Sequence, residues 1–309
     1  MRILIEPPTW LGDAVMATPA IENLVNYYDE PEVILIGSYI SIELLKNHPR
    51  ISNTYVIRKK YTSLYKISKK LGQFDIFFSF RSSFRSKFLK LLISSKKKFQ
   101  FDRNRYQNRH QVEKYNDFVN DNLNTNFHPG KLIVHPSFKL LNKNSKPIVG
   151  INPGASYGNS KCWYPQKFAQ VATELSNKFD ILIFGSVDEK NIATDIEKLL
   201  IENNVSNYQN LAGNTTISEL INQISNLDLF ITGDSGPMHL AASFEVSTVA
   251  IFGPTRDDET SQWMNNKAVI VKKNLDCQPC MKRICPLKHH NCMKLIKSVD
   301  VLSAIDSLN

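Results

Sequence analysis

An apolar run, Leu229-Phe230-Ile231-Thr232, leads directly into the sequence Gly233-Asp234-Ser235-Gly236-Pro237-Met238-His239. The run is typical of a buried strand, and the residues after it predict the start of a helix. Ser235 or Gly236 can cap this helix, and Pro237 suits its first turn because no N–H is needed there. The free N–H groups and the positive helix end would form an anion site that suits a diphosphate. Asp234 would then stand at the strand tip, where ligands bind in open α/β sheets.

Two other interpretations of this turn are a capped helix without a ligand and the nucleophile turn of a serine hydrolase. A well-capped helix with no ligand explains the serine and the proline, but not the Asp234 and His239 side chains that flank the same turn. A serine hydrolase is disfavoured, although Gly-Asp-Ser-Gly also surrounds the nucleophile of chymotrypsin-like proteases. The sequence context here is α/β, and Pro237 breaks the Gly-x-Ser-x-Gly pattern of α/β hydrolases.

Strand-like runs alternate with helical patterns along the whole chain, which predicts mostly parallel sheets covered on both faces. The polar stretch 142–147 predicts a linker between domains 1–145 and 146–309, two Rossmann-like units facing a central cleft. The predicted strands are 2–5, 33–37, 54–57, 75–78, 148–152, 181–184, 227–232, 248–252 and 268–271. The predicted helices are 14–28, 63–71, 165–179, 187–201, 218–225, 237–243 and 302–308.

The composition excludes several classes of protein. With 309 residues, 42% hydrophobic and 22% charged, the chain is neither disordered nor fibrous. No apolar run approaches the ~20 residues of a membrane span, and the N-terminal run is too short for a signal peptide, so we expect a cytoplasmic protein. Neither Gly-x-Gly-x-x-Gly after a strand nor a P-loop occurs, which disfavours an ordinary dinucleotide-binding domain and a P-loop NTPase.

The positive charge is concentrated in one stretch. Eleven Lys or Arg residues lie between Arg81 and Lys114, opposed only by Asp102 and Glu113, so this stretch accounts for the net charge of +9. A local patch of this kind suggests an anionic partner: nucleic acid, an anionic membrane surface or an acidic substrate. The alternative is a solvated, lysine-rich surface without a partner.

Two further loops follow predicted strands. The loop at 153–163 is rich in small residues and ends in Lys161, so it can bring backbone N–H groups, such as those of Gly154 and Ala155, and an ammonium to a phosphate. A simple turn with a surface lysine is the alternative. The loop at 7–13 is stiffened by prolines and presents Asp13, which is either a general base or the cap of the next helix.

Four cysteines, Cys277, Cys280, Cys285 and Cys292, fall within sixteen residues, with His289 and His290 beside the fourth. Four such thiols can surround a structural zinc ion, but the spacing lacks a second compact pair. The alternative is that they pack as small apolar residues. The sequence leaves the choice open.

Four segments together resemble the signatures of glycosyltransferase family 9, the heptosyltransferases of bacterial lipopolysaccharide core assembly. They keep the family's order and spacing over most of the chain. The Trp-Leu-Gly-Asp form, the Pro-Gly-Ala loop and the cysteine-rich tail are closer to type II of this family than to type I. The four segments are Pro-Thr-Trp-Leu-Gly-Asp-Ala-Val-Met at 8–16, Pro-Gly-Ala…Lys-Cys-Trp at 153–163, Leu-Ala-Gly-Asn-Thr at 211–215 and Gly-Asp-Ser-Gly-Pro-Met-His-Leu-Ala at 233–241.

The resemblance implies a GT-B fold, with an acceptor-binding N-terminal domain and a C-terminal domain that holds ADP-L-glycero-D-manno-heptose. It implies inverting transfer without a metal or other cofactor, and Asp13 matches the proposed catalytic base. An acidic ribose contact is implied after the strand 181–184, where Asp188 and Glu189 stand beside Val187, and that assignment stays open. The donor-binding residues implied are Lys161, Thr215, Asp234, Ser235, Gly236 and His239, in addition to the backbone of Gly154 and Ala155.

For type II the acceptor would be an anionic glycolipid, Kdo-bearing lipid A that already carries one heptose. Arg81, Arg85 and Lys87 lie in the acceptor half and are expected to bind it, and the basic stretch is expected to be attracted to the cytoplasmic face of the inner membrane. No nucleic acid is expected as a partner. The alternatives are type I or another family member with a different acceptor and, from another class, a module that binds nucleic acid or an anionic surface through the same patch.

Overall fold

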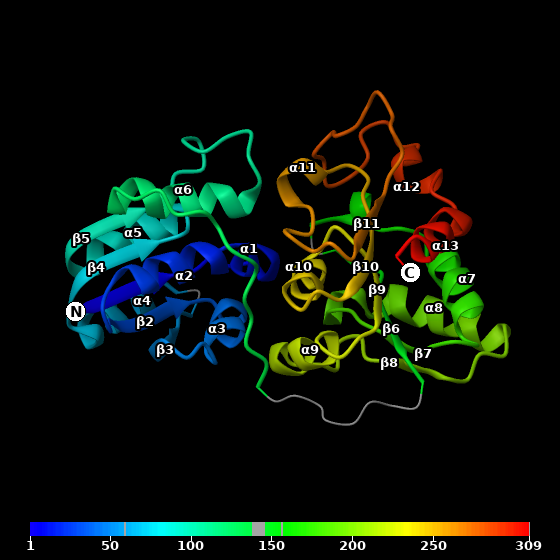
Figure 1. The fold of residues 1–309 in the computed structure, drawn as a ribbon, viewed down its shortest axis with the longest axis horizontal. Helices are drawn as coiled ribbons and strands as arrows, with labels where there is room; N and C mark the ends of the chain where they lie inside the picture. Colours follow the sequence, from blue (N-terminus) through cyan, green and yellow to red (C-terminus); the bar gives the residue numbers. More distant parts are fainter. Residues whose placement is uncertain (59, 138–145, 156, 309) are drawn as a thin grey trace. The chain divides into compact units, whose positions relative to one another are not determined.

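The computed structural model describes residues 1–58, 60–137, 146–155 and 157–308. The chain divides into two compact units, Met1–Ser137 and Phe138–Asn309. Each unit is a parallel sheet covered by helices (Figure 1), as the alternating pattern predicted. Most of the predicted linker, 142–145, lies outside the described residues.

The first unit is built on a five-stranded sheet in the order β3-β2-β1-β4-β5, and all its strand pairs are parallel. Helices α4 and α5 pack together on one face, and α1, α2, α3 and α6 cover the other (Figure 1). Its elements are β1 (Arg2–Glu6), α1 (Leu11–Met16), α2 (Thr18–Tyr27), β2 (Glu32–Gly37), α3 (Tyr39–Leu45), β3 (Ile51–Val56), α4 (Tyr61–Leu71), β4 (Gln73–Ser79), α5 (Phe84–Leu92), β5 (Ser94–Gln100) and α6 (Gln111–Leu123).

The second unit is built on a six-stranded parallel sheet in the order β11-β10-β9-β6-β7-β8. Helices α7, α8 and α13 lie on one face and α9 and α10 on the other. Its elements are β6 (Ile148–Asn152), α7 (Pro165–Leu175), β7 (Asp180–Ile183), α8 (Lys190–Glu202), β8 (Tyr208–Asn210), α9 (Ile217–Ile224), β9 (Leu229–Gly233), α10 (Gly236–Ser243), β10 (Ser247–Ile251), α11 (Asp257–Thr260), β11 (Ala268–Val271), α12 (Asn291–Lys294) and α13 (Ser298–Asp306), with 3-10 turns η1 (Asn159–Lys161) and η2 (Val187–Glu189).

In the first unit, one sequence expectation is corrected, and one strand is present that the sequence analysis did not predict. The helix predicted at 14–28 is two helices, α1 and α2, because Pro19 lies in the first turn of α2 and has no N–H to continue the ladder. The lysine-rich stretch Ser94–Gln100 is an edge strand, β5, that pairs with β4. Lysines are a common protection of edge strands, and here they masked the strand pattern.

Candidate active site

The loops singled out in the sequence follow the strands at which each sheet reverses its order. The reversal falls between β1 and β4 in the first unit and between β6 and β9 in the second. Asp13 and Arg81 follow β1 and β4, whereas Lys161 and Asp234 follow β6 and β9. Open α/β sheets bind ligands beyond the carboxyl ends of the strands at this point, so each unit offers one binding edge there.

The turn after β9 presents a helix N-terminus at this edge. Strand β9 is buried throughout, and α10 begins at Gly236 with Ser235 in the N-cap position. Contrary to the expected capping role, the Ser235 hydroxyl makes no cap hydrogen bond; it bonds the Thr232 hydroxyl at 3.0 Å and accepts from Asn152 Nδ2 at 3.3 Å. Because the serine side chain does not take up these N–H groups, they keep their capacity for an anion.

Lys161 and Asp234, from two different loops, meet in an ion pair. Lys161 Nζ donates to Asp234 Oδ2, and the Thr255 hydroxyl donates to the same oxygen at 2.7 Å. Both side chains are largely buried, with 12% and 7% of their surfaces exposed. Lys161 Nζ also lies 4.7 Å from the centroid of the Tyr157 ring. The structure therefore brings together two residues that are 73 positions apart, and it rejects the reading of Lys161 as a surface lysine.

The start of the 153–163 loop packs against an acidic side chain. A Cβ on Gly154 would lie 2.1 Å from Glu189 Cδ, so only glycine leaves room for this carboxyl group. Glu189 Oε2 accepts from the Ser186 N–H at 2.7 Å, while Asp188 and Val187 are exposed. Of the acidic residues that the sequence left open, Glu189 is the one in contact with the loop.

The other predicted donor residues lie on elements of the same unit. Gly236 opens α10, and His239 is buried one turn later with 3% of its surface exposed. The Ala155 carbonyl accepts from the Gly158 N–H at 3.2 Å. Thr215 is half-buried in the loop between β8 and α9.

In the first unit, Asp13 is neither in a loop nor an N-cap residue. Helix α1 starts at Leu11 with Trp10 as N-cap, which places Asp13 in the first turn. Its carboxylate is hydrogen-bonded to the hydroxyl of Tyr115 on α6. Tyr115 is 4% exposed, and its pKa is raised well above the usual value, mainly by burial and then by the Asp13 charge. Sequence reasoning missed Tyr115, because it reads as one more aromatic residue on the core side of a helix.

The three predicted acceptor residues differ in their surroundings. Arg81 donates to Oε1 of the buried Glu6 at 2.9 Å. Arg85 donates to the Arg58 carbonyl and stacks over the Tyr61 ring at 5.6 Å. Lys87 is exposed on α5. Arg81 is therefore tied into the protein, whereas Lys87 faces solvent.

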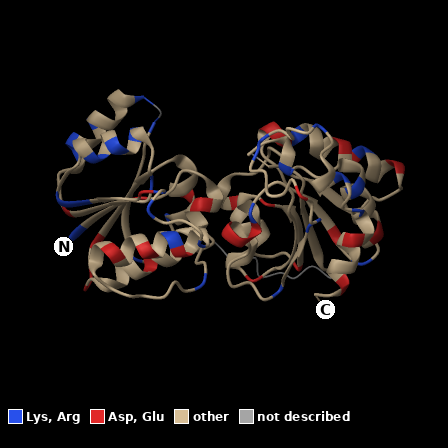
Figure 2. Cartoon of the chain, turned by 90° about the horizontal axis from the view of Figure 1, so that it is seen from above, with Lys and Arg blue, Asp and Glu red and all other residues tan. Residues whose placement is uncertain are grey.

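Two helices on one face of the first unit's sheet, α4 and α5, carry basic but no acidic residues. Figure 2 shows only Lys and Arg among the coloured residues on the helices at its upper left, whereas the helices on the other side carry acidic residues. Helices α4 and α5 contain no Asp or Glu. Apolar side chains are exposed between the charges, namely Tyr61, Tyr65, Phe84 and Leu91, at 49%, 55%, 78% and 77%. Their basic residues are Lys66, Lys69, Lys70, Arg85, Lys87 and Lys90.

All four clustered cysteines are free thiols, and Cys292 is the buried one. Burial raises the pKa of Cys292 to about 11, with smaller contributions from the other three thiols. His290 is engaged elsewhere, since its ring nitrogens pair with the Tyr164 hydroxyl at 3.1 Å and with the Ser160 carbonyl at 2.9 Å. A metal held by these cysteines stays a prediction.

Within the described residues, one group of three metal-ligating side chains has its ligand atoms within 4.8 Å of one another: Glu22, His48 and His135. The Arg50 N–H donates to His48 Nδ1 at 3.1 Å, so the proton of the neutral ring is on Nε2, which faces Glu22. Metal-bound histidines instead donate their second N–H to an acceptor. The group therefore fits a hydrogen-bonded pair with His135 against it better than a metal site.

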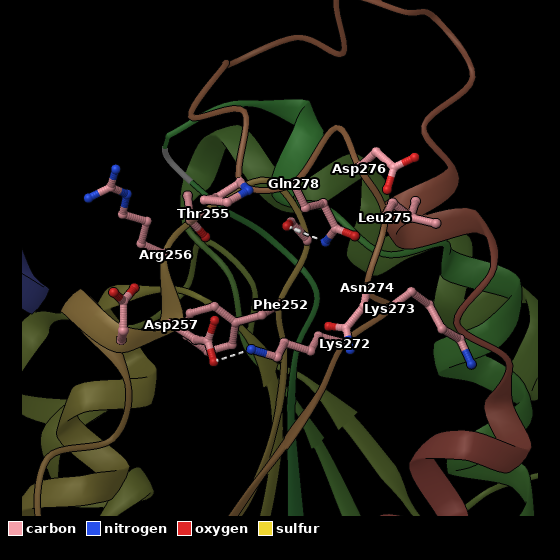
Figure 3. A pocket seen from close by; sticks show the side chains of 13 residues that line it. Phe252, Thr255, Arg256, Asp257, Lys272, Lys273, Asn274, Leu275, Asp276 and Gln278 are labelled. Carbon is pink, nitrogen blue, oxygen red and sulfur yellow. Dashed lines mark hydrogen bonds and ion pairs between the residues drawn. The ribbon is translucent and has the colours of Figure 1, made fainter.

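A pocket of about 610 Å³ adjoins the Asp234 turn in the second unit. It is lined by the segments that follow β10 and β11, and Thr255 links it to Asp234. Figure 3 shows its polar walls, including Lys272 Nζ paired with Asp257 at 2.7 Å and Gln278 donating to the Gly253 carbonyl at 2.6 Å. Charged and amide side chains of this kind suit a hydroxyl-rich ligand rather than an apolar one.

Comparison with known proteins identifies similar sequences. The model of glycosyltransferase family 9 (heptosyltransferase) matches residues 64–291. Lipooligosaccharide heptosyltransferase 2 of Campylobacter jejuni is 42% identical, with the alignment covering 100% of this chain and 98% of that protein. Lipooligosaccharide heptosyltransferase 2 of Haemophilus ducreyi is 26% identical over 88% of each chain.

Solved structures share the fold. The ADP-heptose lipopolysaccharide heptosyltransferase II of E. coli matches with a TM-score of 0.78 and 20% identity, covering 100% of this chain and 98% of that one. A family 9 glycosyltransferase from Veillonella parvula matches with a TM-score of 0.83 and 19% identity, covering 99% and 96%. E. coli heptosyltransferase WaaC, solved with ADP, matches with a TM-score of 0.77 and 12% identity over the full length of both chains.

Proposed function

Because the chain belongs to glycosyltransferase family 9, the heptosyltransferases, we propose that it transfers a heptose from ADP-L-glycero-D-manno-heptose to the lipopolysaccharide inner core. The chain is a glycosyltransferase, and its acceptor in this proposal is Kdo-bearing lipid A that already carries one heptose. The observation that carries the donor assignment is the meeting of Lys161, Asp234 and the start of α10 at one sheet edge. A cation and a helix N-terminus together suit a nucleoside diphosphate.

In this proposal the second unit binds the donor. Lys161 and the first N–H groups of α10 bind the diphosphate, with the backbone of Gly154 and Ala155 beside them. Ser235, Gly236 and His239 line the turn next to the sugar phosphate, and Thr215 contacts the nucleotide. Glu189 accepts a hydrogen bond from the ribose, because its carboxyl group already lies against Gly154.

The first unit supplies the base and binds the acceptor. Asp13 takes the proton from the acceptor hydroxyl as that oxygen forms a bond to the anomeric carbon and the bond to ADP breaks on the opposite side, which inverts the configuration. Tyr115 orients the Asp13 carboxylate through the hydrogen bond between them. Lys161 and α10 stabilise the negative charge of the departing ADP, so we expect turnover to persist in EDTA.

We also propose that α4 and α5 face the anionic membrane surface that holds the acceptor. The six basic residues of these helices attract acidic headgroups, while the exposed tyrosines, Phe84 and Leu91 enter the interface. Among the described residues, no helix combines the length and the apolar character that a membrane span requires.

Turnover with defined acceptors tests the proposal. ADP release from ADP-heptose is measured with Kdo-lipid A that carries no heptose and with the same lipid carrying one heptose. We expect ADP release only with the acceptor that carries one heptose. Release with the heptose-free acceptor alone would assign the chain to type I. Salt-dependent DNA binding without any release would support the nucleic-acid module instead.

A further inference from the structure

We propose that Arg283, which lies in the cysteine-rich segment 277–292, binds the donor diphosphate together with Lys161. This inference rests on the proposed donor site of the second unit, and it gives the cysteine-rich segment a direct part in substrate binding. A single arginine between cysteines has no recognisable sequence motif, which is why sequence reasoning did not select it.

Backbone contacts fix the cysteine-rich segment against the loop that carries Lys161. The Tyr157 hydroxyl donates to the Met281 carbonyl at 2.8 Å, and the Ser160 hydroxyl donates to the Lys282 carbonyl at 2.5 Å. The Ser160 N–H donates to the Arg283 carbonyl at 3.2 Å. Three consecutive residues of the segment, 281–283, are thus hydrogen-bonded to Tyr157 and Ser160 of the loop, which shortly precede Lys161.

Gly158 shows how close the two backbones are. Its φ is +150°, and a Cβ at this position would lie 2.6 Å from the Arg283 carbonyl oxygen. Any other residue at 158 would be strained and would push the segment away. The position of Arg283 is therefore coupled to that of the Lys161 loop.

The Arg283 guanidinium lies over the same ring as the Lys161 ammonium. Its Cζ atom is 5.4 Å from the centroid of the Tyr157 ring, and Lys161 Nζ is 4.7 Å from that centroid. Tyr157 therefore holds two cations beside one loop through cation–π contacts. A diphosphate next to this ring is within reach of both.

The charge balance explains why a second cation is needed. The charge of Lys161 is already offset by Asp234 in the ion pair between them. Arg283 is exposed, and no carboxylate of the described residues forms an ion pair with it. It therefore supplies the uncompensated positive charge, and its guanidinium matches the geometry of phosphate oxygens.

The test is ADP binding, measured by titration calorimetry, for the wild type, Arg283→Ala and the control Lys282→Ala. Lys282 has the same charge one residue earlier in the exposed segment, and its carbonyl contact with Ser160 survives the substitution. We expect Arg283→Ala to weaken ADP binding about tenfold, Arg283→Lys to recover part of this loss, and Lys282→Ala to bind like the wild type.

The outcomes separate this inference from the proposed function. If the wild type does not bind ADP, the proposed donor site fails. If the wild type binds ADP and Arg283→Ala binds it equally well, only the role of Arg283 fails. Equal losses for Arg283→Ala and Lys282→Ala would also overturn it, because they would indicate a diffuse positive surface rather than a contact.

Discussion

Each unit has a buried pair of opposite charges where its sheet reverses order, yet the two pairs differ in their surroundings. In the first unit, Glu6 pairs with Arg81 and also accepts from the hydroxyls of Ser79, at 2.7 Å, and Ser86. In the second, Asp234 pairs with Lys161 and accepts from Thr255. Both pairs occupy the position at which α/β sheets bind ligands.

The difference lies in where the carboxylate stands. Glu6 is the last residue of β1, is 1% exposed and has its oxygens occupied by the protein's own donors. Asp234 comes one residue after β9, beside the N-terminus of α10 and the pocket that Thr255 lines. The Glu6–Arg81 pair, whose carboxylate belongs to the strand, therefore stabilises the sheet edge. The Asp234–Lys161 pair, whose carboxylate follows the strand, is available to a ligand. In the first unit it is instead Asp13, on α1, that we expect to act on substrate.

The largest effect is expected for Asp13→Ala, which separates the two units by function. Loss of a general base lowers the rate of transfer by about 10²–10⁴. ADP binding should stay unchanged, because the donor site lies in the second unit. Rapid-quench assays and ADP titration check both. Tyr115→Phe keeps the aromatic ring but loses the hydroxyl, and it should lower the rate less than Asp13→Ala does. Near-normal turnover by Asp13→Ala would show that Asp13 is not the general base.

Glu6→Gln should destabilise the protein rather than impair substrate binding. Removing one member of a buried pair costs about 3 kcal/mol, because Arg81 is left without its anion. Urea unfolding followed by circular dichroism measures the change. The control is Lys96→Gln, which breaks the exposed pair with Asp75 and should leave stability unchanged. Unchanged stability of Glu6→Gln would show that this pair does not stabilise the sheet edge.

Lys161→Ala should impair substrate binding, which Glu6→Gln should not. The protein should still fold, with some loss of stability because the buried Asp234 loses its cation. ADP binding should weaken about tenfold and turnover should fall further, because the ammonium meets charge that grows as ADP departs. Calorimetry measures the ADP affinity, and steady-state kinetics measures the rate of turnover. An unchanged ADP affinity together with an unchanged rate would reduce the loop to a structural turn.

Charge reversal on α4 and α5 tests the surface of the first unit. Lys66→Glu combined with Lys87→Glu should lower binding to vesicles containing anionic lipid by about thirtyfold or more and raise the acceptor KM, since each basic residue near such a surface contributes about 1 kcal/mol. The matched control reverses the charge of two exposed lysines of the second unit, with the substitutions Lys178→Glu and Lys198→Glu. Equal losses for both variants would point to net charge rather than to this face.

The smallest effect is expected from pH. The pKa of Glu22 is lowered, first by its hydrogen bond to His48, and burial lowers the pKa of His135. As the pH falls below about 6.5, the unfolded chain takes up a proton at His135 before the folded one, and near pH 4.5 the same holds for Glu22. Stability should therefore decrease on acidification. Between pH 7.5 and pH 5.5, the melting temperature of the wild type should fall by about 2 °C more than that of His135→Asn. Equal decreases in the two proteins would exclude the contribution of His135.

Sequence reasoning recovered the alternating fold and the turn after β9 because both depend on local patterns. It missed β5, whose lysines resemble a surface loop, and it joined α1 to α2. The partners of Asp13 and Lys161 come from distant parts of the chain: Tyr115 lies on α6, and Asp234 follows β9, 73 positions after Lys161. No local pattern indicates such pairs, because the sheet order brings them together only after folding.

Hydrogen–deuterium exchange with and without ADP tests most directly the claim that the two binding edges have different ligands. The account predicts slower exchange at 153–163 and 233–239 when ADP is bound, and no change at 7–16. Slower exchange confined to 7–16, with the second unit unchanged, would contradict it.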